Sequence, residues 1–327
     1  MSRFCAAIFG CDGLRLTAEE KSFFRDVQPF GFILFARNID SADQVRALCD
    51  ELRACVDHHA PILIDQEGGR VQRIRAPMAT EWLPPLEEVQ KARTNAARVM
   101  YLRYRIIAHE LMALGIDADC APMVDVARPD THPFLRNRCY GEDPQQIIEI
   151  GRAVSEGLWD GGVYPVIKHM PGHGLAVVDS HKDLPRVSVP KAELEGDFAP
   201  FKALNDLPMG MTAHIVFEDM DHAPATTSAK MMQFMRDEID FDGLIMTDDI
   251  DMQALSGTVD QRAAAAIAAG CDAVLHCNGT LADRQAVAAA IGEMTEAGQR
   301  RAEAVLAARR QPVPVDIDAL AEELKAF

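Results

Sequence analysis

The sequence predicts an α/β fold, a single (β/α)8 TIM-type barrel with a C-terminal helical extension. Short apolar runs alternate with helix-like segments along the chain, and this alternation predicts a parallel sheet. Eight such runs occur within the 327 residues, and a closed barrel takes about 250 residues. We expect residues 1–327 to form one barrel domain. An open doubly wound sheet is the alternative, but it loses support because no GxGxxG motif follows any run.

The predicted strands are continuous apolar runs, as expected for strands that are buried on both faces. A polar or glycine-containing loop follows each run. In chain order, the predicted strands span residues 5–10, 31–36, 61–66, 116–126, 163–169, 209–217, 243–249 and 272–278.

The predicted helices carry start signals. Thr17 and Ser41 are placed as N-caps of the first two helices, and Asp260 is placed as a cap of a later one. Arg105 is expected on the solvated face of a long amphipathic helix. The remaining predicted helices span residues 92–115, 143–162 and 259–270, and the charged tail is interpreted as a helix that covers the barrel, 299–311.

The composition limits the classes of partner. The chain has 50 acidic and 33 basic side chains and a net charge of −17. This charge argues against nucleic acid or an anionic membrane as partner, because both require a basic footprint. No stretch reaches the ~18 consecutive apolar residues that a membrane span needs. The eight cysteines show no CxxC spacing and are interpreted as reduced core thiols. We expect a cytoplasmic protein that is a monomer or a weak dimer.

Polar side chains are concentrated at the ends of six predicted strands. The carboxyl ends of barrel strands converge on one mouth, where barrel enzymes place their chemistry. The sequence therefore predicts an active site at this mouth. The strand-end residues are Asp65, Gln66, Glu67, Asp125, Lys168, His169, His214, Asp248, Asp249, His276 and Asn278.

Three histidines between residues 166 and 185 raise the question of a metal site. His169 and His173 are four residues apart, but a proline and a glycine between them remove the helical face that such a ligand pair uses. Lys168 would also place a cation beside the metal. We predict no metal and no cofactor, and we keep a metal-dependent barrel hydrolase as a minor alternative.

The other chemistry is acid–base catalysis on a neutral, hydroxyl-rich substrate. Glycoside cleavage needs a carboxylate on one side of the bond and a proton donor on the other. Asp248 or Asp249 can supply the carboxylate, and His181 can supply the proton. Asp179 lies two residues before His181, and a carboxylate near an imidazole fixes its tautomer and raises its pKa.

Six motifs then carry a resemblance to a known family: GFILFARNI, IDQEGGRVQR, KHMPGHG, DSHKDLP, MTAHIVF and GLIMTDDIDM. Together, over about residues 5–280, they resemble the bacterial β-N-acetylglucosaminidases of glycoside hydrolase family 3, the single-barrel enzymes of cell-wall recycling. KHMPGHG followed by DSHxxLP is the most specific pair. The resemblance implies a retaining hydrolase that uses no metal.

The resemblance also implies roles for individual residues. Asp248 matches the nucleophile, and His181 with its partner Asp179 matches the general acid/base on a mobile loop. Thr247 stands where serine is commoner, and Asp251 adds a carboxylate just after the nucleophile. Sugar hydroxyls and the N-acetyl group would be held by Asp65, Arg73, Arg138, Lys168 and His169.

The implied activity is removal of non-reducing terminal GlcNAc from peptidoglycan fragments. The expected substrate is GlcNAc-1,6-anhydro-muramic acid, with or without peptide, and the expected route is a covalent glycosyl-enzyme intermediate. A phosphorylase stays open, because a histidine acid/base does not repel an incoming phosphate dianion. A sugar-binding sensor without turnover is disfavoured, because a binder needs no nucleophile.

Overall fold

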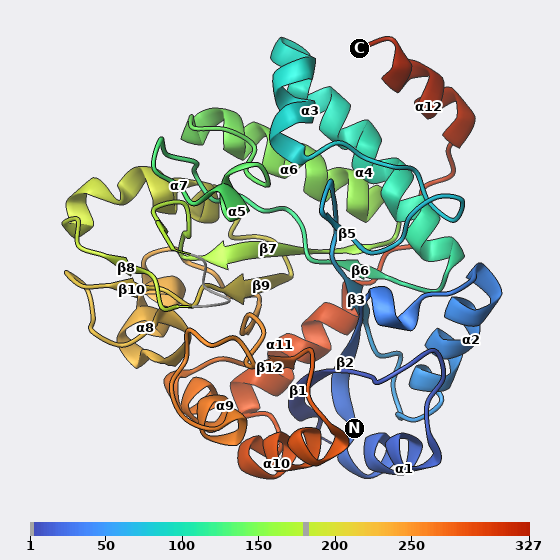
Figure 1. The fold of residues 1–327 in the computed structure, drawn as a ribbon, viewed down its shortest axis with the longest axis vertical. Helices are drawn as coiled ribbons and strands as arrows, with labels where there is room; N and C mark the ends of the chain where they lie inside the picture. The colour runs from blue at the N-terminus through green and yellow to red at the C-terminus, as the bar shows by residue number, and fades with distance from the viewer. Residues whose placement is uncertain (1–2, 179–182) are drawn as a thin grey trace.

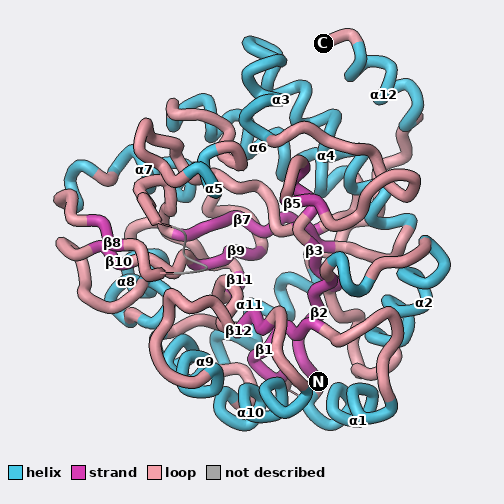
Figure 2. Tube along the Cα trace, viewed as in Figure 1, coloured by secondary structure: helices cyan, strands magenta, loops and turns pink. Residues whose placement is uncertain are grey.

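The computed structural model describes residues 3–178 and 183–327, and its central feature is an eight-stranded parallel sheet with helices around it (Figures 1 and 2). Neighbouring strands follow the order β11-β9-β7-β6-β3-β2-β1-β12. The strands are β1 (Cys5–Gly10), β2 (Pro29–Leu34), β3 (Ile62–Ile64), β6 (Ala118–Asp119), β7 (Tyr164–Met170), β9 (Met209–Thr212), β11 (Leu244–Met246) and β12 (Val274–His276).

A single parallel bridge between Met246 and Ala273 joins the two ends of this order and closes the ring. The bond from the backbone N–H of Asp272 to the carbonyl of Ile245, at 2.8 Å, supports the bridge. Every pairing in the ring is parallel, so all eight carboxyl ends face one mouth. The predicted fold class is confirmed.

The strands are buried because they are apolar on both faces. All residues of β1, β2 and β7 are buried, and their side chains fill either the barrel interior or the layer beneath the helices. Each strand segment predicted from an apolar run overlaps one of these elements, and several observed strands are shorter or shifted. Two of the differences change the path of the chain.

The first difference concerns residues 116–126, where only β6 is a regular strand. Pro122 has no backbone N–H to give to a ladder, although its carbonyl still accepts a bond of 3.0 Å from the backbone N–H of Lys168. The second concerns residues 209–217. β9 ends at Thr212, and the following residues leave the barrel and form β10 (Val216–Phe217), which pairs with β8 (Arg186–Val187).

A second small sheet also lies outside the barrel ring. β4 (Gln66–Gly68) and β5 (Val71–Gln72) form an antiparallel hairpin directly after β3. This hairpin lies within the IDQEGGRVQR motif. It reverses the chain direction, so that the side chain of Arg73 lies beside that of Asp65. Both additional sheets follow barrel strands at their carboxyl ends and therefore build the mouth.

Twelve α-helices are present in the described residues, and they surround the strands (Figure 2). Four short 3-10 turns connect other elements: η1 (Ala36–Asn38), η2 (Arg93–Asn95), η3 (Lys191–Glu193) and η4 (Ala225–Thr227). The helices are α1 (Ala18–Val27), α2 (Ala42–Arg53), α3 (Pro85–Ala92), α4 (Ala96–Ala113), α5 (Pro133–Arg136), α6 (Pro144–Asp160), α7 (Glu195–Ala203), α8 (Ala229–Asp237), α9 (Val259–Ala269), α10 (Leu281–Ile291), α11 (Glu296–Ala307) and α12 (Ile317–Lys325).

Helix starts follow the predicted capping chemistry in most cases. Thr17 and Glu20 form a reciprocal capping box at α1, with bonds of 3.1 and 3.0 Å. Ser41 accepts from the backbone of α2. The placement of a cap at Asp260 is wrong, because Thr258 precedes the first turn of α9 and Asp260 lies within it.

The C-terminal extension consists of α11 and α12, with α12 packed against α4 at the outer edge of the molecule (Figure 1). Glu323 of α12 accepts two bonds from Arg98 of α4, at 2.7 and 2.8 Å. Arg105 is buried, so its predicted solvated position is wrong. The chain after α11 covers this side chain, and its guanidinium donates a hydrogen bond to the carbonyl of Val313. Across the part of the chain that the structure describes, no helix is both long and apolar enough to cross a membrane.

Asp117 ties this extension to the amino-terminal end of the barrel. Its side chain is buried and accepts a 2.8 Å bond from the backbone N–H of Ile62, the first residue of β3. The same carboxylate pairs with Arg53 of α2 at 3.0 Å and with Arg309, which follows α11. One buried carboxylate therefore joins three segments that are far apart in the sequence.

We predict that Asp117→Ala lowers the free energy of unfolding by about 3–5 kcal/mol, because two arginines lose a buried partner. Chemical denaturation followed by circular dichroism measures this change. Asp43→Ala is the matched control, since its pair with Arg46 is exposed and such pairs contribute about 0–1 kcal/mol. Equal losses in the two variants would contradict the assignment.

Candidate active site

The mouth of the barrel contains a cavity of about 230 Å³ lined by residues from six strand ends and the loops that follow them. The predicted nucleophile and all five predicted sugar-binding residues line it together. Their side chains come from positions between residue 65 and residue 248, so only barrel closure brings them into one place. These residues are Asp65, Arg73, Arg138, Lys168, His169 and Asp248.

Lys168 is the most buried cation of this cavity, with 1% of its surface exposed. Its ammonium group lies 2.8 Å from Oδ1 of Asp65 and 2.6 Å from Oε1 of Glu67. Lys168 is in β7, whereas its two partners follow β3. The ion pairs therefore fix the β4–β5 hairpin against β7, which is separated from β3 in the ring only by β6.

Two arginines extend this network. Arg138 donates two bonds to the carboxylate of Glu67, at 2.9 and 2.8 Å, in the bidentate geometry that planar guanidinium groups favour. Arg73 donates to Oδ2 of Asp65 at 2.9 Å. Each carboxylate thus meets two cations, and the cations are held before any ligand binds.

The pairing determines the charge state of the network. Burial by itself raises the pKa of Asp65, but Lys168 and Arg73 outweigh burial and hold that pKa well below its usual value. Burial also opposes ionisation of Glu67, yet Arg138 and Lys168 lower its pKa to about 2. Burial lowers the pKa of Lys168, whereas the two carboxylates raise it above its usual value. All three groups are therefore charged at neutral pH.

His169 is oriented by a buried carboxylate. Oδ2 of Asp125 lies 2.7 Å from Nδ1 of His169, and Oδ1 accepts a 2.7 Å bond from the backbone N–H of His173. Burial raises the pKa of Asp125, but His169 and His173 lower it below its usual value. Because Nδ1 is engaged by Asp125, the other ring nitrogen of His169 is the one available to a ligand in the cavity.

Asp248 follows β11 and faces the same cavity. Its Oδ1 accepts a 2.8 Å bond from the backbone N–H of Asp249. Burial raises the pKa of Asp248, but His169 and His214 outweigh it and hold the pKa below its usual value, so the carboxylate is ionised. Asp249 differs, because burial raises its pKa and its oxygens accept bonds from Cys277 and Asn278.

The two remaining predicted catalytic residues, Asp179 and His181, lie outside the described residues. The segment that leads to them is described up to residue 178 and is attached to the loop after β6. Oγ1 of Thr131 donates to the carbonyl of Gly174, and the backbone N–H of His132 donates to the carbonyl of Ala176 at 3.0 Å. The same loop supplies Arg138 to the cavity.

Comparison with known proteins gives the family. The model of the glycosyl hydrolase family 3 N-terminal domain matches residues 7–310. The chain belongs to this family. It is 36% identical over 279 residues to a beta-hexosaminidase from Alkalilimnicola ehrlichii, and the match covers 83% of this chain and 80% of that protein.

Solved structures of family 3 enzymes agree with this assignment. NagZ from Neisseria gonorrhoeae, solved in complex with zinc ion, superposes with a TM-score of 0.84 at 28% identity, covering 99% of this chain and 96% of that one. A β-N-acetylglucosaminidase from Paenibacillus sp. str. FPU-7 gives 0.84 at 27% identity, and this chain covers 66% of its length. This family 3 member is a glycoside hydrolase of the β-N-acetylhexosaminidase type.

Glu67 and Asp125 lie at predicted strand ends, but no local sequence pattern predicts a role for either of them. In the family 3 barrel they hold Arg138, Lys168 and His169 in place. A count of charges would have given a signal, because buried lysine and arginine side chains require carboxylate partners. Among the described residues, no group of three or more His, Cys, Asp or Glu side chains is arranged to hold a metal ion.

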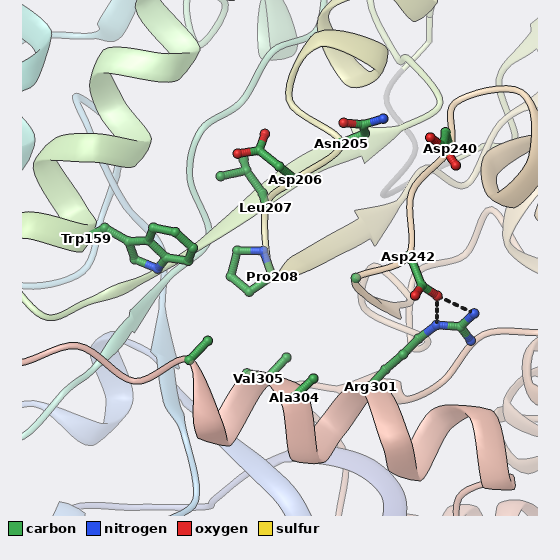
Figure 3. A pocket seen from close by; sticks show the side chains of 12 residues that line it. Trp159, Asn205, Asp206, Leu207, Pro208, Asp240, Asp242, Arg301, Ala304 and Val305 are labelled. Carbon is green, nitrogen blue, oxygen red and sulfur yellow. Dashed lines mark hydrogen bonds and ion pairs between the residues drawn. The ribbon is translucent and has the colours of Figure 1, made fainter.

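A larger cavity, of about 490 Å³, lies at the opposite end of the barrel (Figure 3). Pro208 and Gly243, which line it, directly precede β9 and β11, and α11 forms the facing wall. In Figure 3, Arg301 of α11 reaches Asp242, with an ion pair of 2.9 Å. No predicted site residue lines this cavity, and the amino-terminal end of a barrel serves stability rather than chemistry.

We predict that Glu67→Gln raises KM at least about tenfold and lowers the free energy of unfolding by about 3 kcal/mol, because Lys168 and Arg138 lose their shared buried partner. Steady-state kinetics with an aryl β-GlcNAc and chemical denaturation measure the two effects. Glu81→Gln is the control, since the pair between Glu81 and Arg75 is exposed. Wild-type KM in Glu67→Gln would show that the network does not position the sugar.

Proposed function

We propose that this protein is a retaining exo-β-N-acetylglucosaminidase that removes terminal GlcNAc from peptidoglycan fragments. The observation that carries the proposal is the position of one ionised carboxylate, Asp248, in the same cavity as a preformed network of charged hydrogen-bonding groups. The cavity can enclose one sugar ring, and directional charged groups suit ring hydroxyls.

The sugar-binding roles follow from geometry and charge. Asp65 accepts hydrogen bonds, while Lys168, Arg138 and Arg73 donate them, so adjacent hydroxyls of one ring can be held as donor and acceptor at once. Because these groups are fixed by one another, binding costs little reorganisation. Phe134 adds an apolar surface at the rim of the cavity.

The proposed reaction has two displacements. In the first, a carboxylate oxygen of Asp248 attacks the anomeric carbon, and His181 gives its proton to the leaving oxygen as the glycosidic bond breaks. In the second, His181 removes a proton from water, whose oxygen attacks the same carbon and releases Asp248. Asp179 would orient His181. The resemblance in KHMPGHG and DSHKDLP supports these roles.

The proposed substrate is GlcNAc-1,6-anhydro-muramic acid, with or without peptide, and the proposed site of action is the cytoplasm. The support is the resemblance to the enzymes of cell-wall recycling. All eight cysteines are unpaired and buried, which suits a reducing compartment.

We predict that Asp248→Asn lowers kcat on an aryl β-GlcNAc by a factor on the order of 10⁴ or more, since a covalent nucleophile is removed. A 5-fluoro GlcNAc donor should label wild-type protein on the peptide that contains Asp248, as read by mass spectrometry. Asp251→Asn is the control and should retain labelling. Label on another peptide would reassign the nucleophile.

We predict that His181→Ala affects substrates according to their leaving groups. The sugar released from a disaccharide leaves as a poorly stabilised alkoxide, so kcat on a disaccharide should fall by a factor on the order of 10²–10⁴. The acidic phenol of an aryl glycoside leaves almost unaided, so kcat on that substrate should fall little. Parallel kcat measurements on the two substrates test this, with His222→Ala, an exposed histidine, as control. Equal losses on both substrates would remove His181 from proton transfer.

A further inference from the structure

The loop between β11 and α9, residues 247–258, carries the proposed nucleophile Asp248 and is irregular. Backbone groups in such a loop lack the partners that a helix or a sheet provides. Four successive carbonyls directly after Asp248, those of residues 249–252, nevertheless accept hydrogen bonds from two side chains. These side chains are His214, which follows β9, and Arg262 of α9. The backbone beyond the nucleophile is therefore held from two separate parts of the barrel.

Arg262 holds three of the four carbonyls. Its Nη1 lies 3.2 Å from each of the carbonyl oxygens of Ile250, Asp251 and Met252. One terminal nitrogen of a guanidinium carries two N–H groups, so two protons are shared among three acceptors. Hydrogen bonds from a charged donor are roughly twice as strong as those between neutral groups. A single cationic nitrogen therefore gathers the carbonyls of one turn.

His214 holds the fourth carbonyl. It belongs to the MTAHIVF motif, is 1% exposed, and its Nε2 lies 3.0 Å from the carbonyl oxygen of Asp249. A carbonyl can only accept a hydrogen bond, so Nε2 carries the proton in this contact. Burial lowers the pKa of His214, so the ring is neutral at neutral pH. Nδ1 lies 2.7 Å from Oγ1 of Thr226, which orients the ring from its other side.

Asp249 connects these supports to the nucleophile. Its backbone N–H donates to Oδ1 of Asp248 at 2.8 Å, and its carbonyl is the one that His214 holds. Its side chain is fixed as well, because it accepts a 3.1 Å bond from the backbone N–H of Cys277 and a 2.9 Å bond from the amide of Asn278. The direction of the nucleophilic carboxylate therefore depends on the backbone of one residue, which the supports of the loop hold in place.

The sugar-binding groups are separate from these supports. Asp65, Lys168 and Arg138 line the cavity, whereas Arg262 and His214 do not. Loss of a support should therefore displace the nucleophile and leave the sugar contacts intact. This separation gives the two kinds of residue different kinetic signatures.

We propose that Arg262 and His214 are positioning residues that hold Asp248 for attack on the sugar. They fix the backbone that donates to one carboxylate oxygen, which leaves the other oxygen to attack the anomeric carbon. The inference rests on the proposed function, in which Asp248 performs this attack. Neither side chain touches the substrate, and each acts through the loop. A displacement of a reacting group by about 1 Å can lower a rate about 10²-fold.

The test measures two quantities in wild type and in Arg262→Ala. The value of kcat/KM on an aryl β-GlcNAc reports the attack by Asp248, and the inhibition constant of free GlcNAc reports ground-state binding. We expect kcat/KM to fall by a factor on the order of 10–10², because the nucleophile is misplaced. The inhibition constant should change less than about threefold, because the sugar contacts remain.

Chemical rescue adds a readout that a general loss of stability would not move. Guanidinium ions at millimolar concentration should restore part of the lost kcat/KM in Arg262→Ala, because the small cation can donate to the same carbonyls from the space that the side chain leaves. Wild type should not be stimulated. Arg262→Lys should lie between wild type and Arg262→Ala, since it keeps the charge without the planar donor group.

Arg236→Ala is the matched control. Arg236 of α8 donates from Nη1 to the carbonyls of Phe241 and Gly243, both at 2.7 Å, and these residues precede the same strand β11 at its other end. Its variant should lose stability, because the buried carboxylate of Asp272 also loses a partner. At a temperature where the variant is folded, it should keep the wild-type kcat/KM.

A pair of variants at His214 keeps the test decisive if Arg262→Ala does not fold. His214→Gln retains a side-chain N–H that can donate to the carbonyl of Asp249, whereas His214→Phe removes it. We expect kcat/KM to be higher in His214→Gln than in His214→Phe by about tenfold, as one hydrogen bond supports. Equal values in the two variants would remove His214 from the positioning role.

Three outcomes would overturn the proposal for Arg262: an unchanged kcat/KM in Arg262→Ala, an equal loss in Arg236→Ala, or a loss that GlcNAc binding shares in full. The 5-fluoro GlcNAc donor separates this failure from failure of the proposed function. If wild type is labelled on Asp248 and Arg262→Ala is labelled at the same rate, only the positioning role fails. If wild type neither cleaves the aryl β-GlcNAc nor is labelled on Asp248, the proposed function fails and the positioning role falls with it.

Discussion

The ion pairs between Lys168 and the two carboxylates Asp65 and Glu67 are the interaction on which the rest of the mouth depends. A lysine with 1% exposure would be strongly destabilising without such partners. Its partners are held in turn by Arg73 and Arg138. Lys168 bridges the two carboxylates, and each carboxylate also has an arginine, so removing any one of these groups takes a partner from at least one other. The mouth is therefore a single electrostatic unit rather than a set of independent contacts.

The hairpin that carries Glu67 is supported from behind by α4. Arg103 is fully buried and donates to the backbone carbonyls of Glu67 and Leu83. Gly68 has a φ of 107°, and a Cβ there would lie within 1.9 Å of Nη2 of Arg103. Gly68 of IDQEGGR is therefore required by a guanidinium from outside the barrel, and Glu67 is positioned through its own backbone carbonyl.

The sequence predicted the barrel and the grouping of its strand-end residues, because apolar runs and the parallel arrangement of strands are local and repetitive signals. It did not predict which charges pair. Glu67 pairs with Arg138 and Lys168, and Asp125 pairs with His169. These partners lie between 44 and 101 residues away in the sequence, so no local pattern encodes the pairings. The predicted solvated position of Arg105 was wrong for a related reason, because the segment that buries this side chain lies far away in the sequence, after α11. The exit of β10 from the barrel likewise depends on its pairing with β8. The roles of Asp179 and His181 remain predictions.

The closure of the barrel has a consequence for how the protein is made. β1 pairs with β2 on one side and with β12 on the other, so its second neighbour is the last strand of the chain. Chains emerge from the ribosome amino terminus first, and bringing distant segments together is entropically slow. The first strand therefore keeps one open edge until β12 has been synthesised. Asp248 and Asn278, which line the cavity, belong to the same late segments, so the wall that they form is added only after the sugar-binding network has been synthesised.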